Sequence, residues 1–207
     1  MVKKTVPTTQ FEQIWWQRSF DCVAGVDEAG RGAWAGPVTA GAVILPLSRN
    51  LENMLTGVRD SKQMSARQRD DMLDKIQQVA VAWAVGWASN VEIDMVGILP
   101  ATRLAMQRAV ACLQPAAQAL IIDAVNLPAV ALPQESMKFG DQLCLSIAAA
   151  SICAKVYRDR WMQAADHLYP GYGFARHKGY GTRQHQEAIV ELGVCELHRF
   201  SFRPMTE

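Results

Sequence analysis

The sequence lacks the features that mark membrane, secreted and zinc-binding proteins. No uncharged apolar run is long enough to span a bilayer, and the lysines near the N-terminus are not followed by the apolar stretch of a signal peptide. The five cysteines are odd in number and show no C-x-x-C spacing, and the four histidines match no zinc motif. We therefore expect a cytoplasmic protein whose cysteines are reduced, each packed as a small apolar residue.

An excess of charge of one sign is also missing. The chain carries 21 Lys and Arg against 20 Asp and Glu, a net charge of +1, so any phosphate-binding surface has to be a local patch. With 207 residues, half of them hydrophobic, the chain fits one large globular domain with a small addition. We expect an N-terminal extension over 1–20, a main domain over 21–168 and a mainly helical region over 169–207.

Alternating extended and helical patterns favour an α/β main domain with a mixed sheet flanked by helices. Apolar runs at 23–26, 38–45 and 119–122 and the alternation over 81–87 predict strands, and the glycine-rich connection between the first two predicts that they form a hairpin. Ser65 and Gln68 form a capping box that predicts a helix from about Ala66 to Val79. A second helix is expected from Leu143 to about Leu168. Its small apolar first half is typical of tight packing on a sheet, and its second half places Lys155, Arg158, Asp159 and Arg160 on an exposed face.

Four carboxylates follow predicted extended segments, the last of which is the stretch 138–141. They are Asp27, Glu28, Asp123 and Asp141. Sites in open α/β sheets gather where strand ends meet, and Mg²⁺ prefers carboxylate oxygens together with water and phosphates. Alternatively, Asp27 and Glu28 lie in a solvated turn, and Asp123 and Asp141 only cap the segments after them. Neighbouring strand residues point to opposite faces, so Asp27 and Glu28 can share a site only where a strand ends or bulges.

Three segments have the composition of phosphate or nucleic-acid contacts. Gly30 and Gly32 allow close backbone approach and Arg31 offers a planar fork of donors. Ser61 and Lys62 place a hydroxyl beside an ammonium. The loop 176–183, which contains Lys178 and Tyr180, combines positive charge with an aromatic platform, although a solvated loop with one packed tyrosine is an equal alternative. A phosphate-binding P-loop is excluded because the Lys-Ser/Thr ending is missing.

Taken in order, these motifs resemble bacterial ribonuclease HII from about residue 22 to Phe202. The resemblance is carried by GVDEAGRG at 25–32 with AGP at 35–37, DSK at 60–62, Ile122-Asp123, KFGD at 138–141, SIAAASICAKV at 146–156 and HKGY at 177–180. It implies a ribonuclease H-like fold with the catalytic domain over 21–168. The implied activity is cleavage of RNA in RNA–DNA hybrids, and of DNA strands on the 5′ side of single embedded ribonucleotides, in ribonucleotide excision repair.

The resemblance also assigns roles to residues. It implies that Asp27, Glu28, Asp123 and Asp141 bind two Mg²⁺ or Mn²⁺ ions, and that a water attacks phosphorus to leave 5′-phosphate and 3′-hydroxyl ends. Gly30, Arg31 and Gly32 would sense the 2′-hydroxyl, Tyr180 would pack on the neighbouring nucleotide, and Ser61, Lys62 and Lys178 would contact the substrate. We expect a monomer whose partners are RNA–DNA hybrids and DNA containing ribonucleotides, with no membrane and no evident protein partner.

Small departures from the family pattern affect no proposed ligand. Ala124-Val125 stands where Gly-Asn is common, and Phe139 replaces a smaller residue. Two other functions remain as alternatives. A ribonuclease HIII-like nuclease would carry a further N-terminal domain and a glutamate as fourth acid, whereas about twenty residues precede the first strand here and the fourth acid is Asp141. A non-catalytic hybrid-binding module is disfavoured because all four acids are present.

Overall fold

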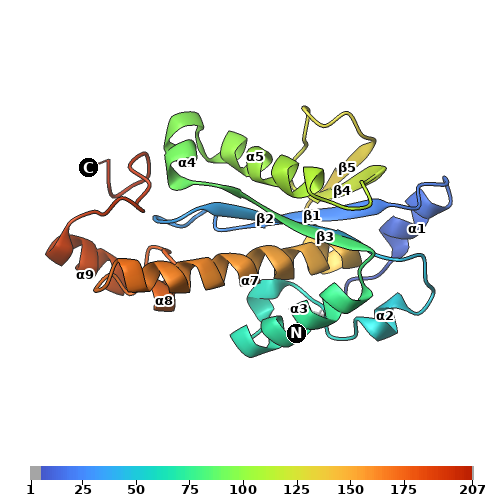
Figure 1. Ribbon diagram of the computed structural model, residues 1–207, viewed down its shortest axis with the longest axis horizontal. Coiled ribbons are helices and arrows are strands. Elements are labelled where there is room, and N and C mark those ends of the chain that lie inside the picture. Colours follow the sequence, from blue (N-terminus) through green and yellow to red (C-terminus); the bar gives the residue numbers. More distant parts are fainter. Residues whose placement is uncertain (1–5, 207) are drawn as a thin grey trace.

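A five-stranded mixed sheet lies between two layers of helices (Figure 1). The structure is a computed structural model and describes residues 6–206, so the expected extension over 1–20 is seen only from Val6. The strand order is β3-β2-β1-β4-β5. The strands are β1 (Val23–Ala29), β2 (Val38–Ile44), β3 (Ala82–Ala88), β4 (Ala119–Asp123) and β5 (Gln134–Met137).

Strand β1 occupies the centre of the sheet and is longer than expected. It pairs antiparallel with β2, which confirms the predicted hairpin, and parallel with β4. The pairing with β2 continues to Ala29 opposite Thr39, whereas the apolar run predicted an end at Val26. Asp27 and Glu28 therefore lie inside the strand, and the expectation that they follow it was wrong. Hydrogen bonding to β2 extends the strand through polar residues that a hydrophobicity pattern cannot include.

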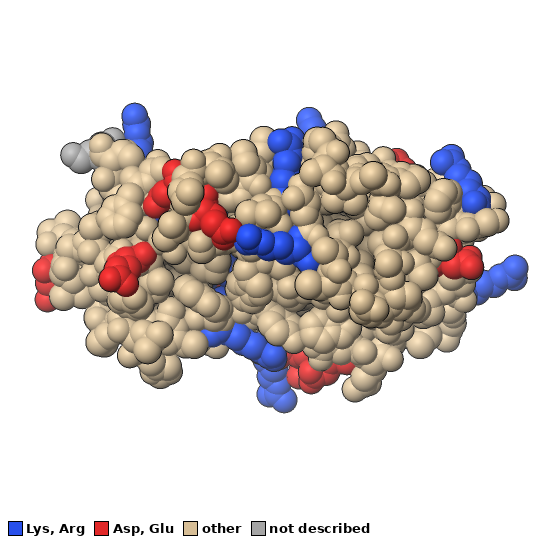
Figure 2. Space-filling view, turned by 45° about the horizontal axis from the view of Figure 1, so that its top comes forward, with Lys and Arg blue, Asp and Glu red and all other residues tan. Residues whose placement is uncertain are grey.

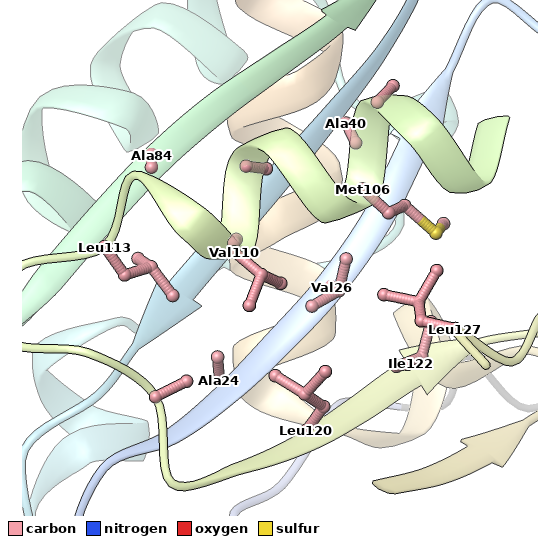
Figure 3. Packing of buried hydrophobic residues seen from close by; sticks show 14 of the residues in the cluster. Ala24, Val26, Ala40, Ala84, Met106, Val110, Leu113, Leu120, Ile122 and Leu127 are labelled. Carbon is pink, nitrogen blue, oxygen red and sulfur yellow. The ribbon is translucent and has the colours of Figure 1, made fainter. Parts of the chain in front are cut away.

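Helices α4 (Asn90–Val96) and α5 (Ile98–Ala111) cover one face of the sheet. Met106 and Val110 of α5 point at Ala24 and Val26 of β1 and at Ile122 of β4 (Figure 3). These side chains belong to one buried cluster that also includes residues of β2 and β3. Alternate β1 residues thus face α5, which leaves Gly25 and Asp27 on the opposite face of the sheet.

The long helix α7 (Leu145–Leu168) packs on that opposite face, joined by α3 (Ala66–Val79). A Cβ added at Gly25 would lie 2.2 Å from the Ser146 carbonyl carbon, and one at Gly41 would lie 2.2 Å from the Ala150 oxygen. Helix and sheet backbones are therefore as close as glycine allows, which confirms the tight packing predicted from the small apolar half of the helix. The capping box of Ser65 and Gln68 at the start of α3 is also confirmed.

The second half of α7 differs from expectation. Arg158 is fully buried and Asp159 is 9% exposed, so the prediction that both lie on an exposed face was wrong. The Arg158 guanidinium donates to the backbone oxygens of Ala35, Pro37 and Lys178 at 2.9–3.1 Å. A charge pattern predicts exposure because a buried charge is costly, and here the partners that offset the cost are loop carbonyls distant in sequence.

Helix α1 (Gln10–Trp16) fastens the N-terminal segment to the start of α7. Glu12 is fully buried and accepts a hydrogen bond from the Ser146 backbone N–H at 2.7 Å. A carboxylate at a helix N-terminus satisfies an unpaired donor and interacts favourably with the helix dipole. Trp15 is buried against the domain in a cluster with Val23 and Ile147.

The chain after α7 forms α8 (Phe174–His177) and α9 (Arg183–Leu192), which lie at one end of the molecule (Figure 1). Short helices α2 (Leu51–Met54) and α6 (Gly140–Leu143) and a single 3₁₀ turn, Ser61–Gln63, complete the described elements. Cys144 and Cys153 are buried as expected, but Cys112 is exposed, and the expectation was wrong for that residue.

The surface agrees with the near-zero net charge. On the side that carries α4 and α5, basic and acidic side chains are scattered among uncharged ones (Figure 2). Within residues 6–206, no helix combines the length and the apolar character needed to cross a bilayer.

The backbone is strained at Ala124, in the turn that follows β4, and the strain can be tested by substitution. Ala124 has a φ of 57°, in the left-handed region that costs most residues roughly 1–2 kcal/mol. Glycine avoids this cost but loses about 0.5–1 kcal/mol of chain entropy. We expect Ala124→Gly to raise the free energy of unfolding by about 0.5–1 kcal/mol, measured by urea denaturation. The control Ala164→Gly, at an exposed position in the interior of α7, should lower it by about 1 kcal/mol. A loss of stability in Ala124→Gly would contradict the assigned strain.

Candidate active site

The parallel pairing of β1 with β4 brings the first and third acids together. Val26 lies opposite Ile122, so Asp27 and Asp123 occupy the next position on each neighbouring strand. Strand β4 ends at Asp123, and the pairing with β1 ends just before it. The acids therefore stand at the carboxyl ends of parallel strands, where the sheet opens to ligands.

Asp141 reaches the same region by a route that the sequence did not predict. It is the second residue of helix α6 and does not end an extended segment, so that expectation was wrong. The extended run ends because Phe139 adopts a left-handed conformation with φ of 59°. The Gly140 backbone N–H then donates to Asp123 Oδ1 at 2.7 Å, which ties α6 to the end of β4.

Burial and mutual repulsion raise the pKa values of three of these acids. Burial raises the pKa of Asp27 well above its usual value, and repulsion from Glu28 and Asp123 adds to the effect. Burial likewise raises the pKa of Glu28, although the nearby Arg31 guanidinium, 3.1 Å away, opposes the shift. Burial, followed by repulsion from other acids, raises the pKa of Asp141 to about 6. The carboxylates are thus close enough to disfavour each other's charge.

Lys62 is the cation placed among these acids. Burial acts to lower its pKa, but attraction to Asp27 and Asp141, with smaller contributions from Asp60 and Glu28, outweighs burial and raises it. Lys62 therefore stays positively charged at neutral pH. Asp60 accepts a hydrogen bond from the Lys62 backbone N–H at 2.9 Å and repels Asp141. Asp60 was not among the site residues predicted from the sequence.

Helix α7 supports the site through Ser151, a second residue that the sequence analysis missed. Its hydroxyl lies 2.9 Å from the hydroxyl of Ser61, and its hydrogen bond to Asp27 lowers the pKa of that acid. Ser61 is itself buried, so in this conformation its hydroxyl contacts α7 and does not face solvent. A small polar residue on the apolar half of a helix is the signal that could have identified Ser151.

The acids fit divalent cations, although they do not form a closed cage. In these rotamers no three His, Cys, Asp or Glu side chains within residues 6–206 converge on one metal position. Glu28 Oε2, however, is buried and has no hydrogen-bond partner, which is costly without a cation or water. Magnesium suits such a site because it keeps several waters and takes only one or two carboxylates with substrate phosphates.

The two glycines after β1 serve different purposes. Gly30 has a φ of 94°, and a Cβ there would lie 1.9 Å from Arg158 Nε, so the fold requires glycine. A Cβ at Gly32 would meet no protein atom within 4 Å, and Gly32 is exposed. Nothing in the protein itself requires glycine at position 32.

Tyr180 lies beside the Gly30–Gly32 turn. It forms an antiparallel bridge with Ala33, and its ring is 5.3 Å from the Arg158 guanidinium carbon and 5.5 Å from Lys155 Nζ. The Trp34 backbone N–H donates to the Gly179 oxygen at 2.7 Å. The structure thus brings the 176–183 loop against the first hairpin.

A row of buried histidines supports this loop from behind. The Cys195 backbone N–H donates to His198 Nδ1 at 2.9 Å, which places the His198 proton on Nε2, 3.1 Å from His185 Nε2. His185 Nδ1 must then donate to the Tyr180 oxygen, 3.1 Å away. Burial lowers the pKa of His185 to about 4, so the row is neutral at pH 7.

A groove of about 390 Å³ adjoins Tyr180 on the side of α3 and α7. It has a positive balance, because its lining contains five cationic and two acidic side chains. These are Arg69, Lys155, Arg160, Arg176 and Lys178, with Asp70 and Asp159. Lys178 is half-buried and donates to the Ala175 oxygen. The groove is therefore a local basic patch next to the aromatic ring of Tyr180.

Comparison with known proteins identifies the family. The family model for ribonuclease HII matches residues 24–205. The ribonuclease HII of Chloroflexus aurantiacus is 50% identical over 203 residues, which are 98% of this chain and 96% of that protein. The ribonuclease HII of Thermus thermophilus is 47% identical over 196 residues, 95% of this chain and 93% of the relative.

Solved structures agree on the fold. The ribonuclease H2 of Pyrococcus horikoshii superposes with a TM-score of 0.73 at 25% identity, over 89% of this chain and 95% of that one. The ribonuclease HII of Archaeoglobus fulgidus, solved with PCNA, gives 0.74 at 22% identity over 88% and 95%. A ribonuclease HIII, Bst-RNase HIII, solved with Mn²⁺, gives 0.64 at 18% identity over 89% and 68%.

These matches cover nearly the whole chain, and they include the hairpin that carries Asp27 and Glu28 as well as the ends of β4 and β5. The expected ribonuclease H-like sheet flanked by helices, with a helical C-terminal part, is confirmed. The chain therefore belongs to the ribonuclease HII family, whose members are metal-dependent endoribonucleases acting on RNA–DNA hybrids.

Proposed function

We propose that this protein cleaves the RNA strand of RNA–DNA hybrids and also cuts duplex DNA on the 5′ side of single embedded ribonucleotides, leaving 5′-phosphate and 3′-hydroxyl ends. One observation carries the proposal. Strand β1, which holds Asp27 and Glu28, continues directly into the Gly30–Gly32 turn, whose exposed Gly32 leaves room for a ribose. The acids Asp27 and Glu28, which would bind the metal ions, are therefore neighbours in the chain of the turn that would contact the ribose.

Asp27, Glu28, Asp123 and Asp141 would hold two Mg²⁺ or Mn²⁺ ions at the scissile phosphate. The raised pKa values of Asp27, Glu28 and Asp141 and the unpartnered Glu28 Oε2 support this assignment, because cations would relieve both the repulsion and the missing contact. Two bound divalent ions activate a water and stabilise the oxygen that leaves phosphorus.

The remaining residues position the substrate. Lys62 remains protonated among the acids and would bind a backbone phosphate next to the scissile one, with Ser61 fixing its turn through Ser151. The backbone of Gly30, Arg31 and Gly32 would hydrogen-bond the 2′-hydroxyl, the group that distinguishes RNA from DNA. Tyr180 would stack on the neighbouring nucleotide, and Lys178 would contact phosphates along the basic groove.

The HIII-like alternative receives less support, because the HIII structure is 18% identical to this chain whereas the ribonucleases HII of two bacteria are 47% and 50% identical, and because the fourth acid is an aspartate. A hybrid-binding module without catalysis would bind the same duplexes. Three synthetic duplexes of one sequence separate these functions: one with a single ribonucleotide, one with an RNA strand and one of DNA only. We expect cutting of the first two with Mg²⁺ and none with EDTA. Binding without cutting would refute the proposed activity.

Asp27→Asn tests the ligand set. Removal of one buried carboxylate charge should lower the cleavage rate by roughly a thousandfold, the size of several kcal/mol of transition-state stabilisation. Affinity for the hybrid in EDTA, measured by fluorescence anisotropy, should stay within about twofold, because the basic groove is unchanged. Asp74→Asn, at an exposed position of α3, is the matched control and should cleave like the wild type. Full activity of Asp27→Asn at saturating Mg²⁺ would show that Asp27 is not a metal ligand.

Gly32→Ala and Gly30→Ala form a second test. A methyl group at Gly32 meets no protein atom, so the midpoint of thermal unfolding of Gly32→Ala should match that of the wild type. Its kcat/KM on the single-ribonucleotide duplex should fall by about tenfold or more, because the methyl group would obstruct the substrate. Gly30→Ala must displace Arg158 and adopt a strained φ, so it should lose about 2 kcal/mol or more of stability. Unchanged kcat/KM in Gly32→Ala would show that no substrate group approaches this glycine.

A further inference from the structure

Arg199 is buried beneath the Gly30–Gly32 turn and binds its backbone from inside. The side chain is fully buried, and its three guanidinium nitrogens donate to three carbonyl oxygens. Nη2 donates to the Gly30 oxygen at 2.7 Å, Nη1 to the Arg31 oxygen at 2.9 Å and Nε to the Gly36 oxygen at 3.0 Å. Arg199 thus ties the Gly30–Gly32 turn to Gly36 further along the same loop.

Because peptide bonds are planar, the contacts of Arg199 with the carbonyls also fix the direction of the Arg31 and Gly32 N–H groups. The Gly30 carbonyl and the Arg31 N–H belong to one peptide plane, as do the Arg31 carbonyl and the Gly32 N–H. Both bonds are trans, so the N–H of each plane points opposite to its carbonyl. Because both carbonyls point inward to Arg199, both N–H groups point outward from the buried guanidinium.

The two N–H groups are free to bind a ligand. Within the described residues neither the Arg31 N–H nor the Gly32 N–H donates to a protein acceptor, and both residues are exposed. We propose that Arg199 is a positioning residue for ribose recognition: by binding the Gly30 and Arg31 carbonyls it aims the Arg31 and Gly32 N–H groups at the substrate 2′-hydroxyl. This inference rests on the proposed function, since it presumes that the turn reads the ribose.

The surroundings of Arg199 limit how the turn can move. Asp94 accepts hydrogen bonds from the Phe200 and Ser201 backbone N–H groups, each at 2.9 Å, which anchors the segment that carries Arg199. On the other side of the turn, Arg158 binds the Ala35 and Pro37 carbonyls and packs against Gly30. Two buried guanidinium groups therefore hold one loop, and Arg199 reaches three carbonyls with three separate nitrogens of its planar fork.

Arg199→Lys separates this role from a general need for positive charge. Lysine keeps the charge but offers a single nitrogen, so it cannot hold both carbonyl groups and Gly36. The readout is the ratio of affinities for a duplex with one ribonucleotide and for the matched DNA duplex, measured by anisotropy with Ca²⁺ in place of Mg²⁺. We expect the wild type to prefer the ribonucleotide and Arg199→Lys to lose about tenfold of that preference, with DNA affinity within about twofold.

The ratio distinguishes positioning from mere stability, because partial unfolding lowers affinity for both duplexes equally. The control is Arg108→Lys, which also keeps the charge but removes an arginine contact with a backbone carbonyl, 2.6 Å to the Trp87 oxygen, at an exposed site away from the turn. It should keep the full preference. An unchanged preference in Arg199→Lys would overturn the inference, whereas absence of preference in the wild type would overturn ribose reading by the turn itself.

If Arg199→Lys does not fold, a second measurement on the wild-type protein tests the inference. Amide hydrogen exchange of the free wild-type protein should show that the loop amides of Ala33, Trp34 and Gly36 exchange nearly as slowly as those of β1. These amides donate to the oxygens of Gly30, Gly179 and Leu197. Exchange at these amides at the rate of an unstructured chain would mean that the arginines do not hold the loop, and the inference would fall.

Discussion

The close packing of α7 on β1 and β2 is the constraint on which the rest of the structure depends. Gly25 and Gly41 let the backbone of α7 touch the sheet. This contact fixes the distance of the following helix residues from the strands. Ser151 then reaches Asp27, and two turns further on Arg158 reaches the loop that follows β1. One helix therefore supports the acids with its middle and the Gly30–Gly32 turn with its second half. Glu12 satisfies the start of the same helix, which gives the N-terminal segment a structural role.

The electrostatics of the site follow from this packing. Helix and sheet bury Asp27 and Asp141, and the parallel register adds Asp123 beside them, so negative charges are brought together where solvent can do little to screen them. Lys62 and Arg31 compensate only part of this repulsion. A site with raised carboxylate pKa values and an unpartnered buried oxygen is prepared for cations that arrive with a phosphate, which is how magnesium sites at phosphodiesters are built.

Much of the site could be predicted from the sequence, because its signals are local. A β-rich run followed by acids and glycines identified the hairpin, and Asp123 at a strand end needed only the apolar pattern. Asp141 was found in the right place for the wrong local reason, since the left-handed Phe139 turns an apparent strand into a helix. Arg158 and Arg199 could not be found in this way. Their partners are backbone carbonyls up to 169 residues away, and neither periodicity nor composition records which carbonyls a fold leaves unpaired.

The central claim is that the four acids converge on a divalent metal site at the scissile phosphate. Anomalous diffraction from a co-crystal with Mn²⁺ and a duplex that contains one ribonucleotide, with a non-cleavable linkage on its 5′ side, tests it most directly. The account predicts two anomalous peaks about 3.5–4 Å apart at that phosphate, with oxygens of Asp27, Glu28, Asp123 and Asp141 as ligands. Peaks bound by other acids, such as the groove residues Asp70 and Asp159, with none at Asp27 and Asp123, would contradict it.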